Sequence, residues 1–162
     1  MSMKNWHILL IFGVVILILY LLRKPINKTI ASMTRGYKNN NPGNIRNDNT
    51  LWQGEVTPST DAAFKQFVDM PHGYRAIFVN LRSYFNAGWN TITKIISHYA
   101  PSNENDTKSY ISTVSQVSGI DPDQEIDFSD TDSLIAVVKG ISLQENGIEA
   151  DEDDIIKGFS LV

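Results

Sequence analysis

The pattern of apolar and polar positions divides the chain into an apolar N-terminal run, a short polar segment and a longer mixed region. Residues 6–22 read WHILLIFGVVILILYLL, with no charged side chain. This length is near the lower limit for a helix that spans a bilayer, about 17–25 residues. No small-x-small cleavage site follows the run. We therefore expect 1–24 to be an uncleaved transmembrane anchor, and 25–34, PINKTIASMT, to be a tether.

The mixed region, residues 35–162, has the length of one domain with its own core. Apolar residues recur there at helical spacing, between residues suited to capping helices, such as Asp106, Gly119 and either Asp130 or Ser129. The short runs LWQGEV and AAFKQFV, separated by TPSTD, predict a small β-hairpin or an extended pair. The predicted fold is mostly α with a small β-hairpin, preceded by a single N-terminal transmembrane helix. Helices are expected near residues 74–85, 92–99, 107–117, 134–145 and 153–158.

One position breaks the apolar stripe of the helix near 134–145. Leu134, Val138 and Ile141 lie at i, i+4 and i+7, and the next position on this stripe is Glu145. A carboxyl group that points toward the core or a cleft has its pKa raised by desolvation, and the negative end of the helix dipole acts in the same direction. The acid would stay protonated near neutral pH, as a general acid for glycosidic cleavage must. Alternatively, Glu145 turns to water at the helix end.

Composition narrows the possible functions. The chain has no cysteine, which excludes a disulfide framework and thiolate zinc sites, and its three histidines show no metal-ligand spacing. We expect no metal and no cofactor. The formal net charge is -4, and all 18 acidic residues follow the apolar run. A basic surface is missing, which argues against nucleic acid as a partner.

Several motifs, read in order, resemble one family. They are NNNPGNIR at 39–46, WQG at 52–54, FKQF at 64–67, GYRA at 73–76, YAPSNENDT at 99–107 and ENG at 145–147. This series is similar to that of phage virion-associated, lysozyme-like peptidoglycan hydrolases and lytic transglycosylases. The resemblance implies an α+β, lysozyme-like domain over residues 35–162 that cleaves peptidoglycan, with Glu145 as the acid. The family pattern has a basic residue before the acid, where this chain has Gln144.

A second resemblance predicts the geometry of the site. Flagellar-type and autolysin-type glucosaminidases carry their acid in a Glu-Ser-Gly or Glu-Thr-Gly motif at a helix end, followed by an Asn-rich loop and a Trp-x-Gly hairpin. In this chain the same pieces are circularly permuted, with the Asn-rich loop first and the Glu helix last. We therefore expect Glu145 to lie beside Asn40, Asn41 and Asn44.

The other candidate residues each have a structural alternative. Asn40, Asn41 and Asn44 are predicted to bind sugar groups or orient the acid, or only to fix turns, since Asn tolerates left-handed backbone. Trp52 and Tyr99 are predicted to stack on sugar rings, or to pack in the core. Glu55 is the candidate for a second carboxylate, or an exposed residue at a strand end.

The sequence thus predicts a membrane-anchored enzyme that cleaves the MurNAc-GlcNAc strand during phage wall penetration or host lysis. Its expected partners are peptidoglycan, membrane lipid at residues 6–22, and capsid or membrane proteins of a virion. The basic residues after the anchor outnumber Lys4, which alone favours a cytoplasmic domain, whereas the activity requires access to the periplasmic wall. Hydrolase and transglycosylase chemistry both stay open. The alternative is a non-catalytic wall-binding or structural virion membrane protein, or a holin-like protein.

Overall fold

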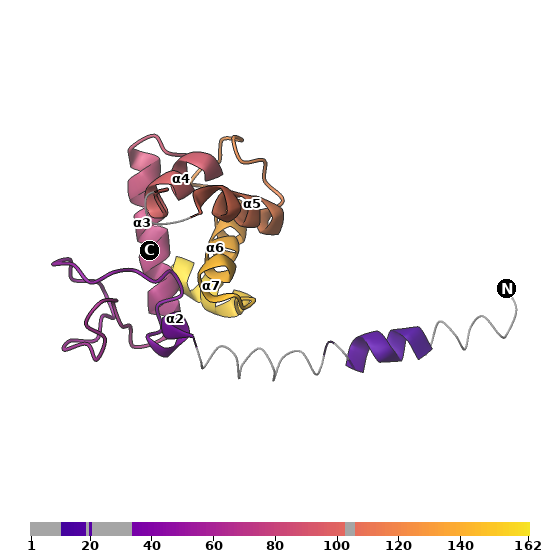
Figure 1. The fold of residues 1–162 in the computed structure, drawn as a ribbon, viewed down its shortest axis with the longest axis horizontal. Coiled ribbons are helices and arrows are strands. Elements are labelled where there is room, and N and C mark those ends of the chain that lie inside the picture. Colours follow the sequence, from indigo (N-terminus) through magenta and orange to yellow (C-terminus); the bar gives the residue numbers. More distant parts are fainter. Residues whose placement is uncertain (1–10, 19, 21–33, 103–105) are drawn as a thin grey trace, which may run out of the picture.

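In the computed structural model, described residues are 11–18, 20, 34–102 and 106–162. Six labelled helices follow one another along the chain, and loops join them (Figure 1). Residues 11–18 form a further, unlabelled helix whose side chains are exposed. The labelled helices are α2 (Arg35–Lys38), α3 (Met70–Asn86), α4 (Ile92–Tyr99), α5 (Thr107–Ser118), α6 (Thr131–Asn146) and α7 (Glu152–Ser160).

The predicted mostly α class is confirmed, and the helix ends lie where the capping residues indicated. The side chains of Asp106 and Asp130 accept hydrogen bonds from the first turns of α5 and α6. Gly119 and Gly147 end the same two helices in left-handed conformation. Asp69 caps α3 in the same way as the other two aspartates.

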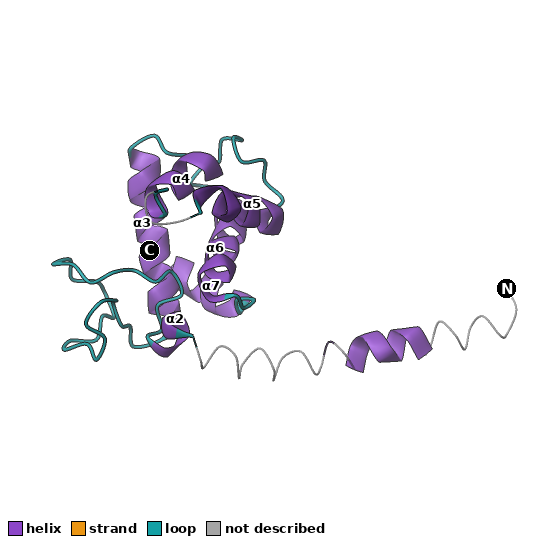
Figure 2. Ribbon diagram, viewed as in Figure 1, coloured by secondary structure: helices purple, strands orange, loops and turns teal. Residues whose placement is uncertain are grey.

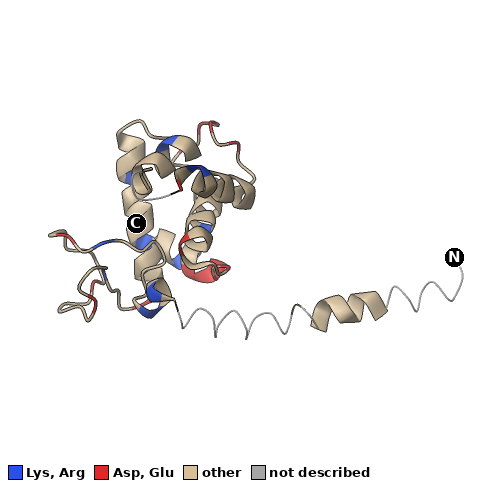
Figure 3. Ribbon diagram, in the orientation of Figure 1, with Lys and Arg blue, Asp and Glu red and all other residues tan. Residues whose placement is uncertain are grey.

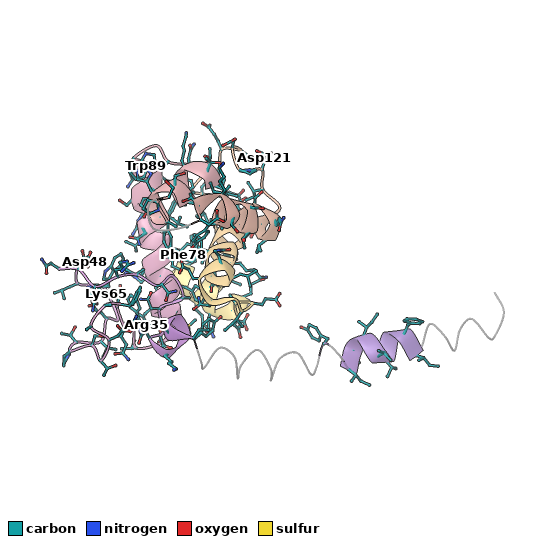
Figure 4. The ribbon with its side chains drawn as sticks, viewed as in Figure 1. Arg35, Asp48, Lys65, Phe78, Trp89 and Asp121 are labelled. Atoms are coloured by element: carbon teal, nitrogen blue, oxygen red, sulfur yellow. The ribbon has the colours of Figure 1, made fainter. Side chains whose placement is uncertain are left out.

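The core lies among α3 to α7. Helix α3 packs along α7, α5 packs along α6, and α4 lies against α5. Close approach of α5 and α6 depends on Gly140, because a Cβ there would collide with the backbone of Val114. Fully buried apolar side chains come from each of these helices; they include Ile77, Phe78, Leu81, Ile95, Ile96, Val114, Leu134, Val138, Ile141 and Ile155. Figure 4 shows Phe78 in the interior of this helical group.

The predicted β-hairpin was wrong. The described residues contain no strand, and Figure 2 shows residues 46–68 as loop. Two isolated antiparallel bridges remain, Arg46 with Phe64 and Glu55 with Phe67. The second run bonds to the first through Val56 N to Gln66 O and Val68 N to Gly54 O. It also bonds to the Asn-rich segment, through Lys65 N to Ile45 O and Phe67 N to Asn39 O.

Of the predicted anchor's apolar run, residues 6–22, the structure describes 11–18 and 20, and of the tether it describes only residue 34; the rest of both lies outside the described residues. In the part of the chain that the structure describes, no helix reaches the length and apolarity needed to span a membrane.

Candidate active site

The carboxyl group of Glu145 is the centre of the candidate site. It lies in the last turn of α6 and is only partly exposed. Its Oε2 accepts a hydrogen bond of 2.9 Å from Asn44 Nδ2, and its Oε1 accepts one of 2.8 Å from the hydroxyl of Tyr110. These partners come from the Asn-rich loop and from α5. Three segments that are distant in sequence therefore meet at one carboxyl group.

The Asn-rich loop, residues 39–46, divides its side chains between two tasks. Asn41 is fully buried, and its amide donates to the carbonyls of Ile45 and Lys65. Asn40 donates to Phe67 O. Both side chains thus hold the loop, whereas Asn44 points to Glu145. The predicted neighbourhood is confirmed for Asn44, and the structural alternative describes Asn40 and Asn41 better.

Two asparagines of this loop have left-handed backbone, with φ of 49° at Asn40 and 46° at Asn44. Asn adopts this conformation more readily than most residues, because its short polar side chain bonds locally. The turn at Asn44 is what brings its side chain to α6. The Asn-rich composition therefore reflects backbone geometry as much as chemistry.

Asn146 fixes the loop to the end of α6. Its buried amide donates to Pro42 O at 2.8 Å and to Ser142 O at 3.0 Å. Gly36 makes room for it, because a Cβ there would collide with the Asn146 side chain. The sequence indicated Asn146 only as a helix-ending residue. The structure shows that it joins the loop to the helix next to the carboxyl group.

Tyr99 and Tyr110 form the aromatic wall of the site. Their rings lie edge to face with centroids 6.3 Å apart. The Tyr99 hydroxyl donates to Gly43 O at 2.5 Å, and a Cβ on Gly43 would collide with that hydroxyl. Tyr99 thus contacts the loop rather than standing free for a sugar. Tyr110 appeared in the sequence only as an apolar position of its helix, so its bond to Glu145 had no signal there.

Burial sets the protonation of these groups. Desolvation raises the pKa of Glu145 above its ordinary value, and the bonds from Asn44 and Tyr110 offset part of this effect. Burial also raises the pKa of Tyr110, and the nearby Tyr99 and Glu145 act in the same direction. Tyr110 therefore keeps its proton, which it can donate to an ionised Glu145. The Tyr110 hydroxyl can also accept a hydrogen bond from a protonated Glu145, whereas Nδ2 of Asn44, the atom that contacts Glu145, can only donate.

The loop of residues 46–68 is organised by one buried lysine. Lys65 is 2% exposed, and its Nζ donates to Asp48 O at 3.0 Å, Thr50 O at 2.7 Å and Glu55 Oε1 at 3.0 Å. The other Glu55 oxygen accepts from Trp52 N. Figure 4 shows Lys65 and Asp48 together on this side of the domain. Glu55, the candidate second carboxylate, is thus engaged within the loop.

Trp52 is half-buried, and its Nε1 has no hydrogen-bond partner among the described residues. The same part of the chain holds no group of three or more side chains suited to a metal. Acidic residues gather away from the candidate site, in the first turn of α7 (Figure 3). These residues, Glu152, Asp153 and Asp154, lie at the positive end of the helix dipole, where negative charge is stabilising.

Fold and site together define a mostly α domain in which an Asn-rich loop and a tyrosine hold a half-buried carboxyl group at the end of a helix. The chain belongs to the same family as Protein P5 of Pseudoalteromonas phage PM2. It is 36% identical to that protein over 135 residues, which cover 80% of this chain and 82% of the phage protein. No model of a known protein family matches the chain. The relationship gives the chain a bacteriophage context.

Proposed function

We propose that this protein cleaves the glycan strands of bacterial peptidoglycan, with Glu145 as general acid and base. One observation carries the proposal: a carboxyl group whose pKa is raised by burial is held by two directed hydrogen bonds, from Asn44 and Tyr110. A buried structural carboxylate usually pairs with a cation, whereas the half-buried Glu145 has two neutral partners. Such an environment favours a protonated acid that is fixed in place.

Asn44 donates to one lone pair of Oε2, so the carboxyl proton must lie elsewhere, on Oε1 or on the other lone pair of Oε2. Glu145 would give this proton to the glycosidic oxygen while the bond between that oxygen and C1 of MurNAc breaks. The Tyr110 hydroxyl would then donate to the carboxylate that remains. Burial makes the acid ready to donate, and the two bonds stabilise the charge it acquires.

The second half of the reaction depends on what attacks C1. In a lytic transglycosylase the 6-hydroxyl of the same MurNAc attacks and returns its proton to Glu145, which leaves a 1,6-anhydro end. In a hydrolase a water attacks, and a second carboxylate usually assists. Since Glu55 is paired with Lys65, the arrangement favours the mechanism with one carboxyl group, hence the transglycosylase.

The proposed setting is an α+β, lysozyme-like domain anchored through residues 6–22 in a virion membrane or the host inner membrane, where it meets the periplasmic wall. The apolar run supports the anchor. The family relationship to a phage protein supports a role in wall penetration or lysis.

A second candidate is a non-catalytic, peptidoglycan-binding or structural virion membrane protein. The exposed apolar helix at 11–18 and the phage relative are as compatible with this candidate as with the enzyme. The two candidates differ in what they require of Glu145, because only the enzyme needs its proton.

The test compares wild type with Glu145→Gln, both as the full chain in mild detergent, on purified peptidoglycan. We expect the substitution to reduce release of soluble muropeptides about 10²–10⁴-fold, the usual contribution of a general acid. Mass spectrometry identifies the products: anhydro ends indicate a transglycosylase, and reducing MurNAc ends a muramidase.

Glu125→Gln is the matched control, because it removes an exposed carboxylate of the loop before α6. It should cleave like wild type. If wild type releases nothing but sediments with the wall, the enzyme proposal fails and the binding protein takes its place.

A further inference from the structure

A second group of aromatic rings lies at the far end of α3. It consists of Tyr84 in α3, Trp89 in the following turn and His98 in α4, and Figure 4 shows Trp89 at this end of the helix. The rings of Trp89 and His98 are stacked, with centroids 3.2 Å apart and an angle of 29° between their planes. Tyr84 lies 5.6 Å from Trp89 and 6.3 Å from His98.

The turn after α3 determines where the Trp89 ring lies. Gly88 has a φ of 82°, which few other residues adopt, and it reverses the chain after α3. Trp89 N then donates to Tyr84 O at 2.9 Å. The reversal turns the indole back over Tyr84 and against α4.

Core packing alone does not account for this arrangement. Trp89 is half-exposed and His98 is exposed. Tyr84 packs against the buried core, as do Phe85 and Phe128 of a neighbouring edge-to-face pair, so the exposed part of the group is Trp89 and His98. The Trp89–His98 stack instead presents aromatic surface to solvent, which suits the C–H groups of a sugar ring, since the face of an aromatic ring carries partial negative charge.

Tyr84 connects the stack to the candidate acid. Besides its ring contacts with Trp89 and His98, Tyr84 interacts electrostatically with Tyr99 and Tyr110, and the Tyr110 hydroxyl bonds to Glu145. A glycan strand is a linear polymer, so an enzyme that cleaves it gains affinity from rings placed beyond the reacting bond.

We propose that Tyr84, Trp89 and His98 form an accessory subsite that stacks on a sugar ring of the glycan strand, away from the bond that Glu145 cleaves. This inference rests on the proposed function and adds a site to it. It predicts that long strands bind better than short ones, and that Trp89 supplies the difference.

The experiment measures binding of the full chain in mild detergent, carrying Glu145→Gln so that strands are not cut. The probes are uncrosslinked GlcNAc-MurNAc strands of two and of six repeats. Trp89→Ala should weaken binding of the long strand about tenfold, as expected for the loss of an aromatic contact, and change that of the short strand less than about twofold. Trp89→Phe should restore most of the loss.

Phe128→Ala is the matched control, because it removes an aromatic ring from the same end of the domain but from the core-packed pair. It should keep the ratio of long-strand to short-strand affinity. The inference is overturned if Trp89→Ala leaves long-strand binding unchanged, or weakens both strands equally, as a damaged fold would. In either case cleavage by wild type still stands. If wild type neither cleaves peptidoglycan nor binds either strand, the proposed function fails with it.

Discussion

The helical part of the domain and the segment of residues 35–69 are held together by different interactions. Between α3 and α7, buried apolar side chains from each helix fill a shared core. In the segment 35–69, the buried side chains include Phe67, but also the polar Asn39, Asn41 and Lys65. There, side-chain amide and ammonium groups bond to backbone carbonyls and take the place of a sheet ladder.

The difference explains where the candidate site lies. Apolar packing is non-directional and tolerates small shifts, whereas a hydrogen bond requires a particular distance and angle. Glu145 belongs to a helix of the apolar part, and Asn44 belongs to the polar segment. The site forms where the two parts meet, so that the core gives burial and the loop gives direction.

The largest expected effect is on the free energy of unfolding, which a substitution in the helical core and one in the polar segment should lower in different ways. Ile141→Ala empties a fully buried position in α6 and should cost about 2–5 kcal/mol of the free energy of unfolding, spread over all helices. Lys65→Met leaves Glu55 without its cation and should cost about 3 kcal/mol, concentrated in residues 45–68. Hydrogen exchange measured residue by residue distinguishes a global from a local loss.

Lys157→Met is the control for Lys65→Met. Lys157 is 65% exposed and lies 3.9 Å from Asp154, so its loss should change stability by less than about 0.5 kcal/mol. Equal loss of protection in α6 and in the loop after Lys65→Met would show that the two parts unfold as one.

A smaller effect should separate two asparagines of the same loop. Both Asn44 and Asn40 have positive φ, so glycine at either position removes the side chain without straining the backbone. Asn44→Gly loses the bond to Glu145 and should reduce cleavage about tenfold, the value of one hydrogen bond to a charged group. Asn40→Gly loses only its bond to Phe67 O and should keep its activity while losing about 1 kcal/mol of stability.

Rates on purified peptidoglycan and thermal unfolding of both variants check this prediction. If Asn40→Gly loses as much activity as Asn44→Gly, the loop contributes through its overall shape and the direct bond to Glu145 has no special role.

The contrast between the two parts also explains what the sequence could predict. Helical periodicity and capping residues located α3 to α6, because these elements depend on local pattern and a shared apolar core. The position of Glu145 on that stripe followed from the same rule. The hairpin was wrong because LWQGEV and AAFKQFV look like strands only as short apolar runs, whereas the buried Lys65 bonds to carbonyls of the loop. Tyr110 was missed because a tyrosine on an apolar face gives no sign of where its hydroxyl points.

The smallest effect concerns the protonation of Glu145 itself. The bond from Tyr110 lowers the pKa of Glu145 and so opposes burial. Tyr110→Phe removes this bond, so the pKa should rise further. Because a general acid works only while protonated, the alkaline limb of the pH profile of kcat/KM should move to higher pH, with the maximal rate reduced less than about tenfold. The profile of wild type, measured in parallel, gives the reference.

Stability provides an independent check with the same sign. The folded-state pKa of Glu145 is raised above the unfolded value, so the folded protein holds this proton more tightly. The resulting stabilisation is fully present below the ordinary pKa of glutamate and is lost as pH rises through the folded pKa. Glu145→Gln has no such proton and should lack that decline, whereas Tyr110→Phe should extend it to higher pH. If unfolding free energies of the three proteins run parallel across this range, Glu145 titrates as it would in water and burial does not tune it.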